Sequence, residues 1–497
     1  MVALLLGTGG CVENRARRDL DTRTWTRDDR AMFVTGKQLP QFEPATTAAA
    51  LHHNYDLSFI EFDEQGDYWD RRQLGWTIDA IKREARAKDL VLLIYVHGWQ
   101  NDAGTLPGHD VDKFEGLLNR LASTESTPNR RFFGVYIAWR GKSVPGGDGV
   151  FSPGSPMDWL SQAVLLVPHE LSLYDRQRAA IRTAGMPITE AIFASVNASR
   201  TAARESGHLT RSILIGHSFG ALIVEKALCE ALAAQVIVND AYSGQPFPAP
   251  ADTVLLLNSA AQSIYAKELM DMLRRRRPAG DRGEAGEITA DRPLVVSVTS
   301  TADSATGTLF PIGVGLGNIA AITRQYDWDT YYGPSSHGVP QRQYLITTPG
   351  HNDWLISHDA VPLPGNIPAM PVLNDETETY DSSISLKGID KNLNAPISEV
   401  NTPDGKLGFV TVDGTGGTCH WAITPRAYQY QTPYWIIQVP KQIMREHSDI
   451  FNENSLSLLA RLVRLTNPDN SPGIHLSSEP RTMQLAAPGT VSSSTAQ

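Results

Sequence analysis

The chain has few cysteines, no long run of charge of one sign, and no apolar segment in its body long enough to cross a bilayer. Its three cysteines are too few and too scattered for a disulfide framework, a zinc site or an iron–sulfur cluster. The formal net charge of −10 comes from mixed charges, and the one basic cluster, Arg274 to Arg277, is more typical of a helix C-terminus than of a phosphate site. We therefore expect a protein with a soluble body, without a metal and without a nucleic-acid partner.

The N-terminus has a pattern of its own. The opening MVALLLGTGGCVENRARRD combines a short apolar run, small residues, Cys11 and a strongly polar stretch. This order resembles the end of a bacterial lipoprotein signal, in which the cysteine receives the lipid, although a basic leading segment is missing and Thr8 stands where leucine is commoner. Two interpretations follow: a protein of the bacterial cell envelope tethered to the membrane by lipidation of Cys11, or a cytoplasmic protein with an irregular N-terminal segment.

Strand-like and helix-like segments alternate through most of the chain. The strand-like segments are nearly continuous apolar runs, which predicts that helices cover both faces of each strand in a doubly wound, mostly parallel α/β sheet. Ligands bind at the carboxyl ends of the strands in such sheets, so we expect the chemistry directly after these runs. The expected strand segments span residues 57–62, 90–99, 131–141, 212–220, 253–260 and 293–303, and the clearest helical patterns span 71–88, 112–123 and 221–235.

The composition divides the chain into a body and flanking segments. We expect an α/β domain at 57–465, preceded by a signal-like segment and polar extension at 1–56 and followed by a disordered tail at 466–497. Two insertions interrupt the domain: a helical cap at 142–210 and a loop-rich β insertion at 360–430. In the first, four apolar residues share one helical face, which can line a pocket or simply pack the helix onto the body. They are Met157, Leu160, Val164 and Val167.

The segment SILIGHSFGALIV, Ser212 to Val224, places a serine between two glycines where a strand-like run meets a helix-like run. Gly-x-Ser-x-Gly alone is weak evidence, but this setting is typical of a nucleophile on a sharp strand-to-helix turn. Gly216 and Gly220 meet the need for small residues two positions before and after it, so that strand and helix can approach. The following helix N-terminus favours a developing anion. We therefore predict Ser218 as the nucleophile.

A serine nucleophile needs a base, and the base needs an acid that fixes its tautomer. On a sheet of this kind the acid and then the histidine follow the serine along the chain. Asp303 is the preferred acid because it follows an apolar run two strands along the sheet, although a turn or helix-cap role is the alternative. Asp240, in VIVND before the next strand, is a weaker candidate.

Two histidines are candidates for the base. His447 lies between the strand-like YWIIQV and the helical pattern of NSLSLLARLVRL, which is the expected setting for the loop before the last helix. His351, in YLITTPGHNDW, is the alternative, and a structural role for both histidines is the third. We expect His217 to point away from Ser218, as neighbours on a sharp turn do, and His97, which precedes Ser218, to have another role.

An oxyanion formed at the serine needs two backbone N–H donors. One is expected from Phe219, directly after the serine. The other is expected from the HGWQ loop that follows the LIYV stretch, Leu93 to Val96, where His97 and Gly98 mark the strand end. There the amide of Trp99 is preferred, and Gln100 is the alternative.

Together the motifs resemble the α/β-hydrolase superfamily, with HGW after the third strand, GHSFG after the fifth, TSTAD after the seventh and EHSDI before the closing helix. The segments FIEFDEQG, VHGWQNDA, VYIAWRG and TSTADSATGTLFPIG are similar to a group of largely uncharacterised bacterial and fungal α/β-hydrolases. The resemblance covers roughly residues 57–465 and implies an α/β-hydrolase fold and a Ser-His-Asp hydrolase without metal or organic cofactor. The long stretch between Asp303 and His447 departs from the simplest pattern and leaves the base open.

We expect an esterase or lipase-like enzyme acting on a small-molecule or lipid ester. An acyltransferase with the same triad is one alternative. The other is a binding protein without catalysis, on a hydrolase scaffold, with the insertion at 360–430 as its interaction surface. The sequence does not indicate an oligomeric state.

Overall fold

The computed structural model describes the following parts of the chain. These are residues 55–99, 101–103, 110–124, 130–140, 176–242, 250–275, 293–311, 314, 325–326, 339–362, 407–412, 418–426 and 434–465. The segments 1–54 and 466–497, which include Cys11 and the predicted tail, lie outside them. So does the helical face from Met157 to Val167.

Within these residues, ten strands form one mixed sheet in the order β1-β3-β2-β4-β5-β6-β12-β9-β11-β10. The strands from β1 to β12 in this order pair in parallel, and β9 also runs parallel to β12. The parallel core consists of β1 (Tyr55–Glu61), β3 (Arg130–Ala138), β2 (Asp89–Val96), β4 (Thr210–His217), β5 (Thr253–Leu257), β6 (Val295–Ser300) and β12 (Tyr434–Val439). The predicted α/β architecture with a mostly parallel sheet is therefore present.

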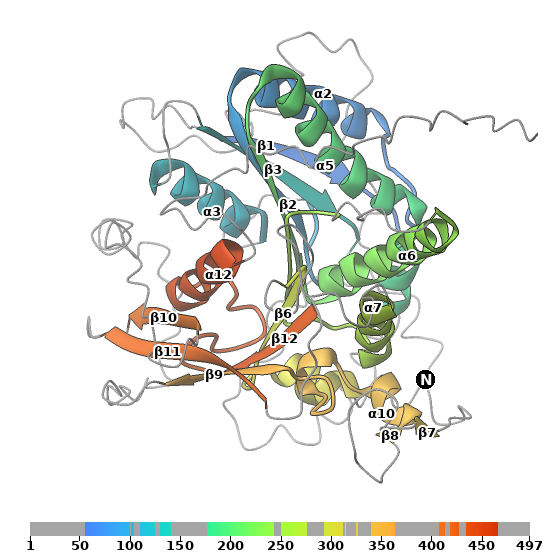
Figure 1. The fold of residues 1–497 in the computed structure, drawn as a ribbon, viewed down its shortest axis with the longest axis vertical. Helices are drawn as coiled ribbons and strands as arrows, with labels where there is room; N and C mark the ends of the chain where they lie inside the picture. The colour runs from blue at the N-terminus through green and yellow to red at the C-terminus, as the bar shows by residue number, and fades with distance from the viewer. Residues whose placement is uncertain are drawn as a thin grey trace, which may run out of the picture.

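Helices cover both faces of the sheet (Figure 1). One face carries α2 (Arg72–Ala87), α5 (Met186–Ser206), α6 (Phe219–Tyr242), α7 (Ser263–Arg275) and α10 (Gln341–Ile346). The other carries α3 (Asp110–Thr124) and α12 (Glu453–Leu465). Successive strand residues point to opposite faces, so Leu92 and Ile94 of β2 pack in the first core cluster, and Leu93 packs in the second. This two-sided burial explains why the strands are continuous apolar runs.

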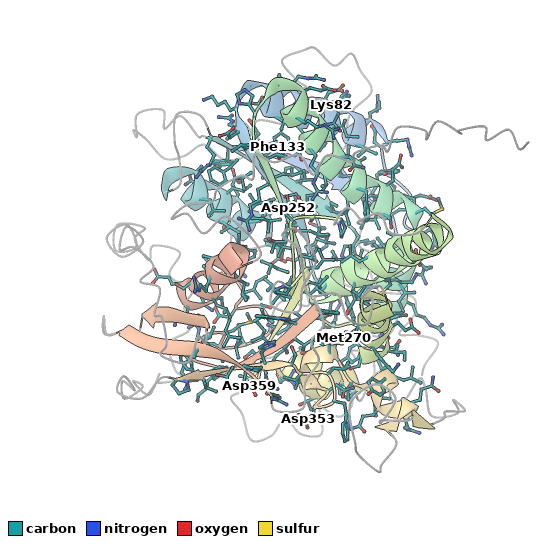
Figure 2. The ribbon with its side chains drawn as sticks, in the orientation of Figure 1. Lys82, Phe133, Asp252, Met270, Asp353 and Asp359 are labelled. Carbon is teal, nitrogen blue, oxygen red and sulfur yellow. The ribbon has the colours of Figure 1, made fainter. Side chains whose placement is uncertain are left out.

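Side chains fill the layers between sheet and helices, where Phe133 of β3 is fully buried (Figure 2). The elements begin and end near their predicted positions, with two systematic differences. The strand β1 begins at Tyr55, two residues before the predicted start, because Tyr55 and Asp56 are buried and paired with β3. Several strands also end before their apolar runs do, because the last residues of those runs form loops at the carboxyl edge.

The predicted β insertion at 360–430 extends the main sheet in its described parts. The strands β9 (His358–Pro362), β11 (Thr418–Pro425) and β10 (Leu407–Val412) continue the sheet beyond β12, and β11 pairs antiparallel with both β9 and β10. This part of the insertion therefore shares the core of the domain. A short pair, β7 (Gln325–Tyr326) and β8 (Val339–Pro340), is separate from the main sheet.

The described part of the predicted cap, residues 176–210, is helical over most of its length and packs on the sheet. Ile188, Ile192 and Val196 of α5 lie in the same core cluster as the side chains of α2 and β2. Residues from Met186 to Ser206 therefore form part of the crossover from β3 to β4 and pack against the sheet. The rest of the predicted cap, up to residue 175, lies outside the described residues.

The arginine run and the search for a membrane-spanning helix concern possible partners of the protein. The helix α7 ends at Arg275, so the Arg274 to Arg277 run begins at a helix C-terminus, as the sequence predicted. A search of the described helices for a membrane span finds none that is long and apolar enough.

The core contains a buried glutamate, Glu225. Glu225 of α6 is fully buried and accepts a hydrogen bond of 2.6 Å from the hydroxyl of Tyr434. Burial disfavours the charged carboxylate and raises the pKa of Glu225 to about 8, although the Tyr434 hydrogen bond opposes this. The folded protein therefore keeps a proton here that the unfolded chain releases above about pH 4.5.

The consequence is a loss of stability as pH rises between about 4.5 and 8. The Glu225→Gln variant cannot titrate and can still accept the Tyr434 hydrogen bond, so it is expected to lose less stability over this window. The losses in free energy of unfolding should differ between wild type and variant by an amount on the order of a few kcal/mol. Thermal unfolding of both proteins at pH 5.5 and 8.5 measures this difference. Equal shifts of the unfolding temperature in wild type and variant would contradict a neutral, protonated Glu225.

Candidate active site

Ser218 occupies the sharp turn between β4 and α6. Its backbone lies in the left-handed region, with φ of 56°, which non-glycine residues seldom adopt and which is typical of strained functional positions. Backbone hydrogen bonds hold it there: its N–H donates to the Leu257 carbonyl at 3.0 Å, and its carbonyl accepts from Ala221 at 3.0 Å, Ala260 at 3.1 Å and Leu222 at 3.3 Å. The sequence-predicted serine therefore lies at a rigid apex at the carboxyl edge of the central strands.

The two glycines of the motif have different neighbours. A Cβ at Gly216 would lie 2.7 Å from the Cα of Ala221, which is the strand-to-helix approach that the sequence predicted. A Cβ at Gly220 would lie only 2.0 Å from the carbonyl oxygen of Val96, at the end of the neighbouring strand β2. Gly220 thus lets α6 approach β2, and the turn is packed against the loop that carries the predicted oxyanion donor.

A hydrogen-bonded chain links Ser218, His447 and Asp303. The Nε2 atom of His447 lies 2.8 Å from the Oγ of Ser218, and its Nδ1 lies 2.9 Å from Oδ2 of Asp303. Ser218 and Asp303 are buried, whereas the side chain of His447 is 22% exposed. The residues come from three places along the chain, and 229 positions separate Ser218 from His447.

Asp303 is held as a carboxylate at the end of β6. Its Oδ1 accepts a hydrogen bond of 3.1 Å from the Thr306 N–H, and its Oδ2 accepts the Thr306 hydroxyl as well as His447. Burial alone raises the pKa of Asp303, but the charge of His447 and the hydrogen bonds from His447 and Thr306 outweigh it and lower the pKa to about 2. Thr306 belongs to η3 (Ala305–Leu309), a single π-helical turn.

The negative charge of Asp303 determines how His447 is protonated. Because a carboxylate only accepts, Nδ1 of His447 carries the proton, and Nε2 is left to accept the Ser218 hydroxyl. Burial lowers the pKa of His447, but attraction by Asp303, the hydrogen bond to Asp303, and the charges of Asp110 and Glu446 together raise it. The arrangement can therefore remove a proton from the serine and stabilise the resulting imidazolium.

Neither competing candidate is hydrogen-bonded to Ser218 in the described residues. His351, in η4 (Pro349–His351), packs against Gly307, and its Nε2 is buried without a hydrogen-bond partner among the described residues. Burial lowers the pKa of His351. Asp240 is near the end of α6, about 30 Å along the helix from Ser218 at 1.5 Å per residue. The structure therefore brings His447 and Asp303 to the serine, and neither His351 nor Asp240.

The loop after β2 is fastened to its neighbours by His97. This buried imidazole donates from Nδ1 to the Gly98 carbonyl at 2.8 Å and accepts the Trp139 N–H at Nε2, 3.1 Å away. The Trp139 indole in turn donates to the His97 carbonyl at 2.9 Å, and the two rings stack. Burial lowers the pKa of His97. His97 therefore has the separate role that the sequence predicted, which is to hold the loop in place.

The predicted oxyanion donors flank Ser218. A Cβ at Gly98 would lie 2.8 Å from the Cβ of Ser218, so this loop is in direct contact with the serine. Trp99 follows Gly98, and Phe219 is the first residue of α6. The alternative donor Gln100 lies outside the described residues. The oxyanion roles of Trp99 and Phe219 stay predictions.

Sequence reasoning did not assign roles to three polar residues around His447. His217 contacts the His447 backbone, Asn258 follows β5 directly, and Asp110 begins α3. A polar residue directly after a buried strand was a usable signal for Asn258, because functional residues gather at that edge. Among the described residues, no group of three or more His, Cys, Asp or Glu side chains could hold a metal ion.

The chain was compared with protein-family models, curated protein sequences and solved structures, and none of them matches it. A functional assignment therefore depends on the fold and on the geometry of the site.

Proposed function

We propose that this protein is a serine hydrolase of α/β-hydrolase type that cleaves carboxylic esters through an acyl-enzyme on Ser218. The observation that carries the proposal is the hydrogen-bonded chain from Ser218 Oγ through His447 to Asp303, with contacts of 2.8 Å and 2.9 Å. The positive φ of Ser218 on a strand-to-helix turn supports it. So do the positions of HGW, GHSFG and TSTAD after β2, β4 and β6, separated by two strands each as in the resemblance.

In the first half-reaction, Ser218 Oγ attacks the ester carbonyl while His447 Nε2 takes the hydroxyl proton. Asp303 stabilises the imidazolium, and the amides of Phe219 and Trp99 donate to the oxyanion. Collapse of the tetrahedral intermediate breaks the bond to the alkoxy oxygen, which takes the proton from His447 and leaves as the alcohol. Water then attacks the acyl-enzyme by the same route and releases the acid.

An ester is favoured over an amide by analogy with the superfamily. Acyl transfer to an alcohol uses the same residues and differs only in the acceptor. A binding protein without catalysis is less well supported, because a complete acid–histidine pair reaches Ser218. The membrane tether through Cys11, the cell-envelope location and the lipid ester substrate remain proposals that rest on the sequence.

The proposal is tested by labelling the wild-type protein with a fluorophosphonate and locating the adduct by peptide mass spectrometry. We expect one adduct, on the peptide that contains Ser218, together with hydrolysis of short or long p-nitrophenyl esters. A protein that is folded but gives neither the adduct nor hydrolysis would overturn the proposal. Added alcohol distinguishes the two reactions: an acyltransferase forms the new ester in preference to the free acid.

A further inference from the structure

The backbone of His447 is held in place by two buried side chains. Its carbonyl oxygen lies 2.7 Å from Nδ2 of Asn258 and 3.0 Å from Nε2 of His217. A carbonyl can only accept hydrogen bonds, so both nitrogens donate, and the proton of His217 on this side is on Nε2. The segment from Lys441 to Asn452 contains no regular helix or strand. The position of the His447 backbone therefore depends on these two hydrogen bonds, where a helix or strand would otherwise hold it.

Asn258 connects the loop of His447 to the loop of Asp303. It is fully buried and has a left-handed backbone, with φ of 44°. Its Oδ1 accepts the Ser300 N–H at 3.0 Å, while its Nδ2 donates toward His447. Ser300 in turn donates its hydroxyl to the Met444 carbonyl at 2.6 Å. One amide side chain therefore sets the end of β6 and the His447 loop relative to each other.

The buried carboxylate of Asp110 lies on the other side of the His217 ring from His447. The Nδ1 atom of His217 has no hydrogen-bond partner among the described residues and faces Oδ2 of Asp110 at 3.8 Å. Asp110 also accepts a hydrogen bond of 2.8 Å from the Tyr95 hydroxyl. Burial raises the pKa of Asp110, but the interaction with His217 and the Tyr95 hydrogen bond lower it to about 2. A second Asp–His pair, Asp110 and His217, thus lies beside the triad, with the His217 and His447 rings 5.1 Å apart.

Buried polar groups are costly unless they are well paired. The hydrogen bonds from Asn258 and His217 converge on the carbonyl oxygen of His447. We propose that Asn258 and His217 are positioning residues of the hydrolase site, which fix the His447 backbone so that its imidazole stays between Ser218 and Asp303. This inference rests on the proposed function, since a positioned base matters only where a proton is transferred.

Asn258→Asp tests the first contact. Aspartate keeps the size, the acceptor for Ser300 and the tolerance of positive φ, but it replaces the donor to His447 with a second acceptor. We expect kcat to fall by roughly 10- to 100-fold with KM within about threefold, because the substrate still binds while the base is misplaced. Fluorophosphonate labelling of Ser218 should slow by a similar factor. The matched control is Asn352→Asp, at another buried asparagine whose amide donates to Thr347.

His217 provides a second, independent test if Asn258→Asp does not fold. His217→Gln retains an N–H donor at a similar reach and is expected to keep most of kcat, whereas His217→Leu removes it and is expected to lose roughly tenfold or more. A purely structural role predicts the same kinetics for any folded variant. Rescue by glutamine but not leucine therefore supports positioning, and equal kcat in both variants overturns it for His217.

The Asp110→Asn variant tests the surroundings of His447 through the pH dependence of kcat/KM. The charged or titratable groups that surround His447 are Asp303, Asp110, Glu446, His217 and His351. Removing the negative charge of Asp110 lowers the pKa of His447, so the acid limb of the kcat/KM profile should move to lower pH with little change in its plateau.

The two proposals fail in different ways. A folded wild-type protein that is neither labelled at Ser218 nor able to hydrolyse the esters overturns the proposed function. A wild-type protein that is labelled, while Asn258→Asp is labelled as fast as the Asn352→Asp control, overturns only the positioning role of Asn258. An unchanged acid limb in Asp110→Asn overturns the influence of Asp110 on His447.

Discussion

Replacing Ser218 with alanine is expected to lower kcat for p-nitrophenyl ester hydrolysis by up to about a million-fold and to abolish fluorophosphonate labelling. The hydroxyl is the only group removed, and the Cβ that contacts Gly98 remains, so the turn between β4 and α6 should keep its packing. The residual activity comes from the oxyanion donors and from substrate binding, which do not need the serine. Steady-state kinetics on purified, folded protein measures the effect.

Ser259→Ala is the matched control for this variant. Ser259 is also buried and lies just after β5, but its hydroxyl accepts a local hydrogen bond from the Ala261 N–H and does not contact His447. We expect its hydrolysis rate within a few-fold of wild type. If Ser218→Ala hydrolyses esters as fast as Ser259→Ala, Ser218 is not the nucleophile.

Replacing His447 with alanine is expected to have an effect of similar size, because a serine without its base is a weak nucleophile. The imidazole contacts both Ser218 and Asp303, so its loss removes the proton acceptor and leaves the Asp303 carboxylate without its main partner. Ester hydrolysis and the rate of Ser218 labelling should therefore fall together.

His351→Ala decides between the two candidate bases. His351 lies near Asp303, where the carboxylate acts on it only through its charge, and its Nε2 has no partner among the described residues. We expect the variant to retain kcat within about fivefold. A severe loss in His351→Ala together with a mild loss in His447→Ala would reverse the assignment of the base.

Much of the site follows from local rules. Continuous apolar runs predict strands buried on both faces, and the residues after those runs lie at the carboxyl edge where parallel sheets place their chemistry. Ser218 and Asp303 were predicted in this way, because Ser218 follows β4 directly, Asp303 lies three residues after the end of β6, and each needs only its own strand to be placed. The small size of Gly216 also follows from the local strand-to-helix turn.

Residues whose position depends on distant contacts were harder to predict. The strand-like and helical segments on either side of His447 favoured it over His351, but such local patterns do not show which loop folds over Ser218. The same limit applies to the insertion at 360–430, whose strands could equally have formed a separate unit, and to α5, whose periodicity does not reveal that it packs on the sheet beside α2.

The sequence by itself determined the class of the fold, the turn that carries Ser218 and the strand that delivers Asp303, because these depend on periodicity and on steric demands within a few residues. Only the tertiary structure decided that His447 joins them and that Asn258 and His217 hold its backbone. Those contacts join groups at the ends of different strands, and 229 positions of chain separate Ser218 from His447. Their geometry depends on how β4, β5, β6 and the loop after β12 meet at one edge of the sheet, which no single stretch of sequence contains.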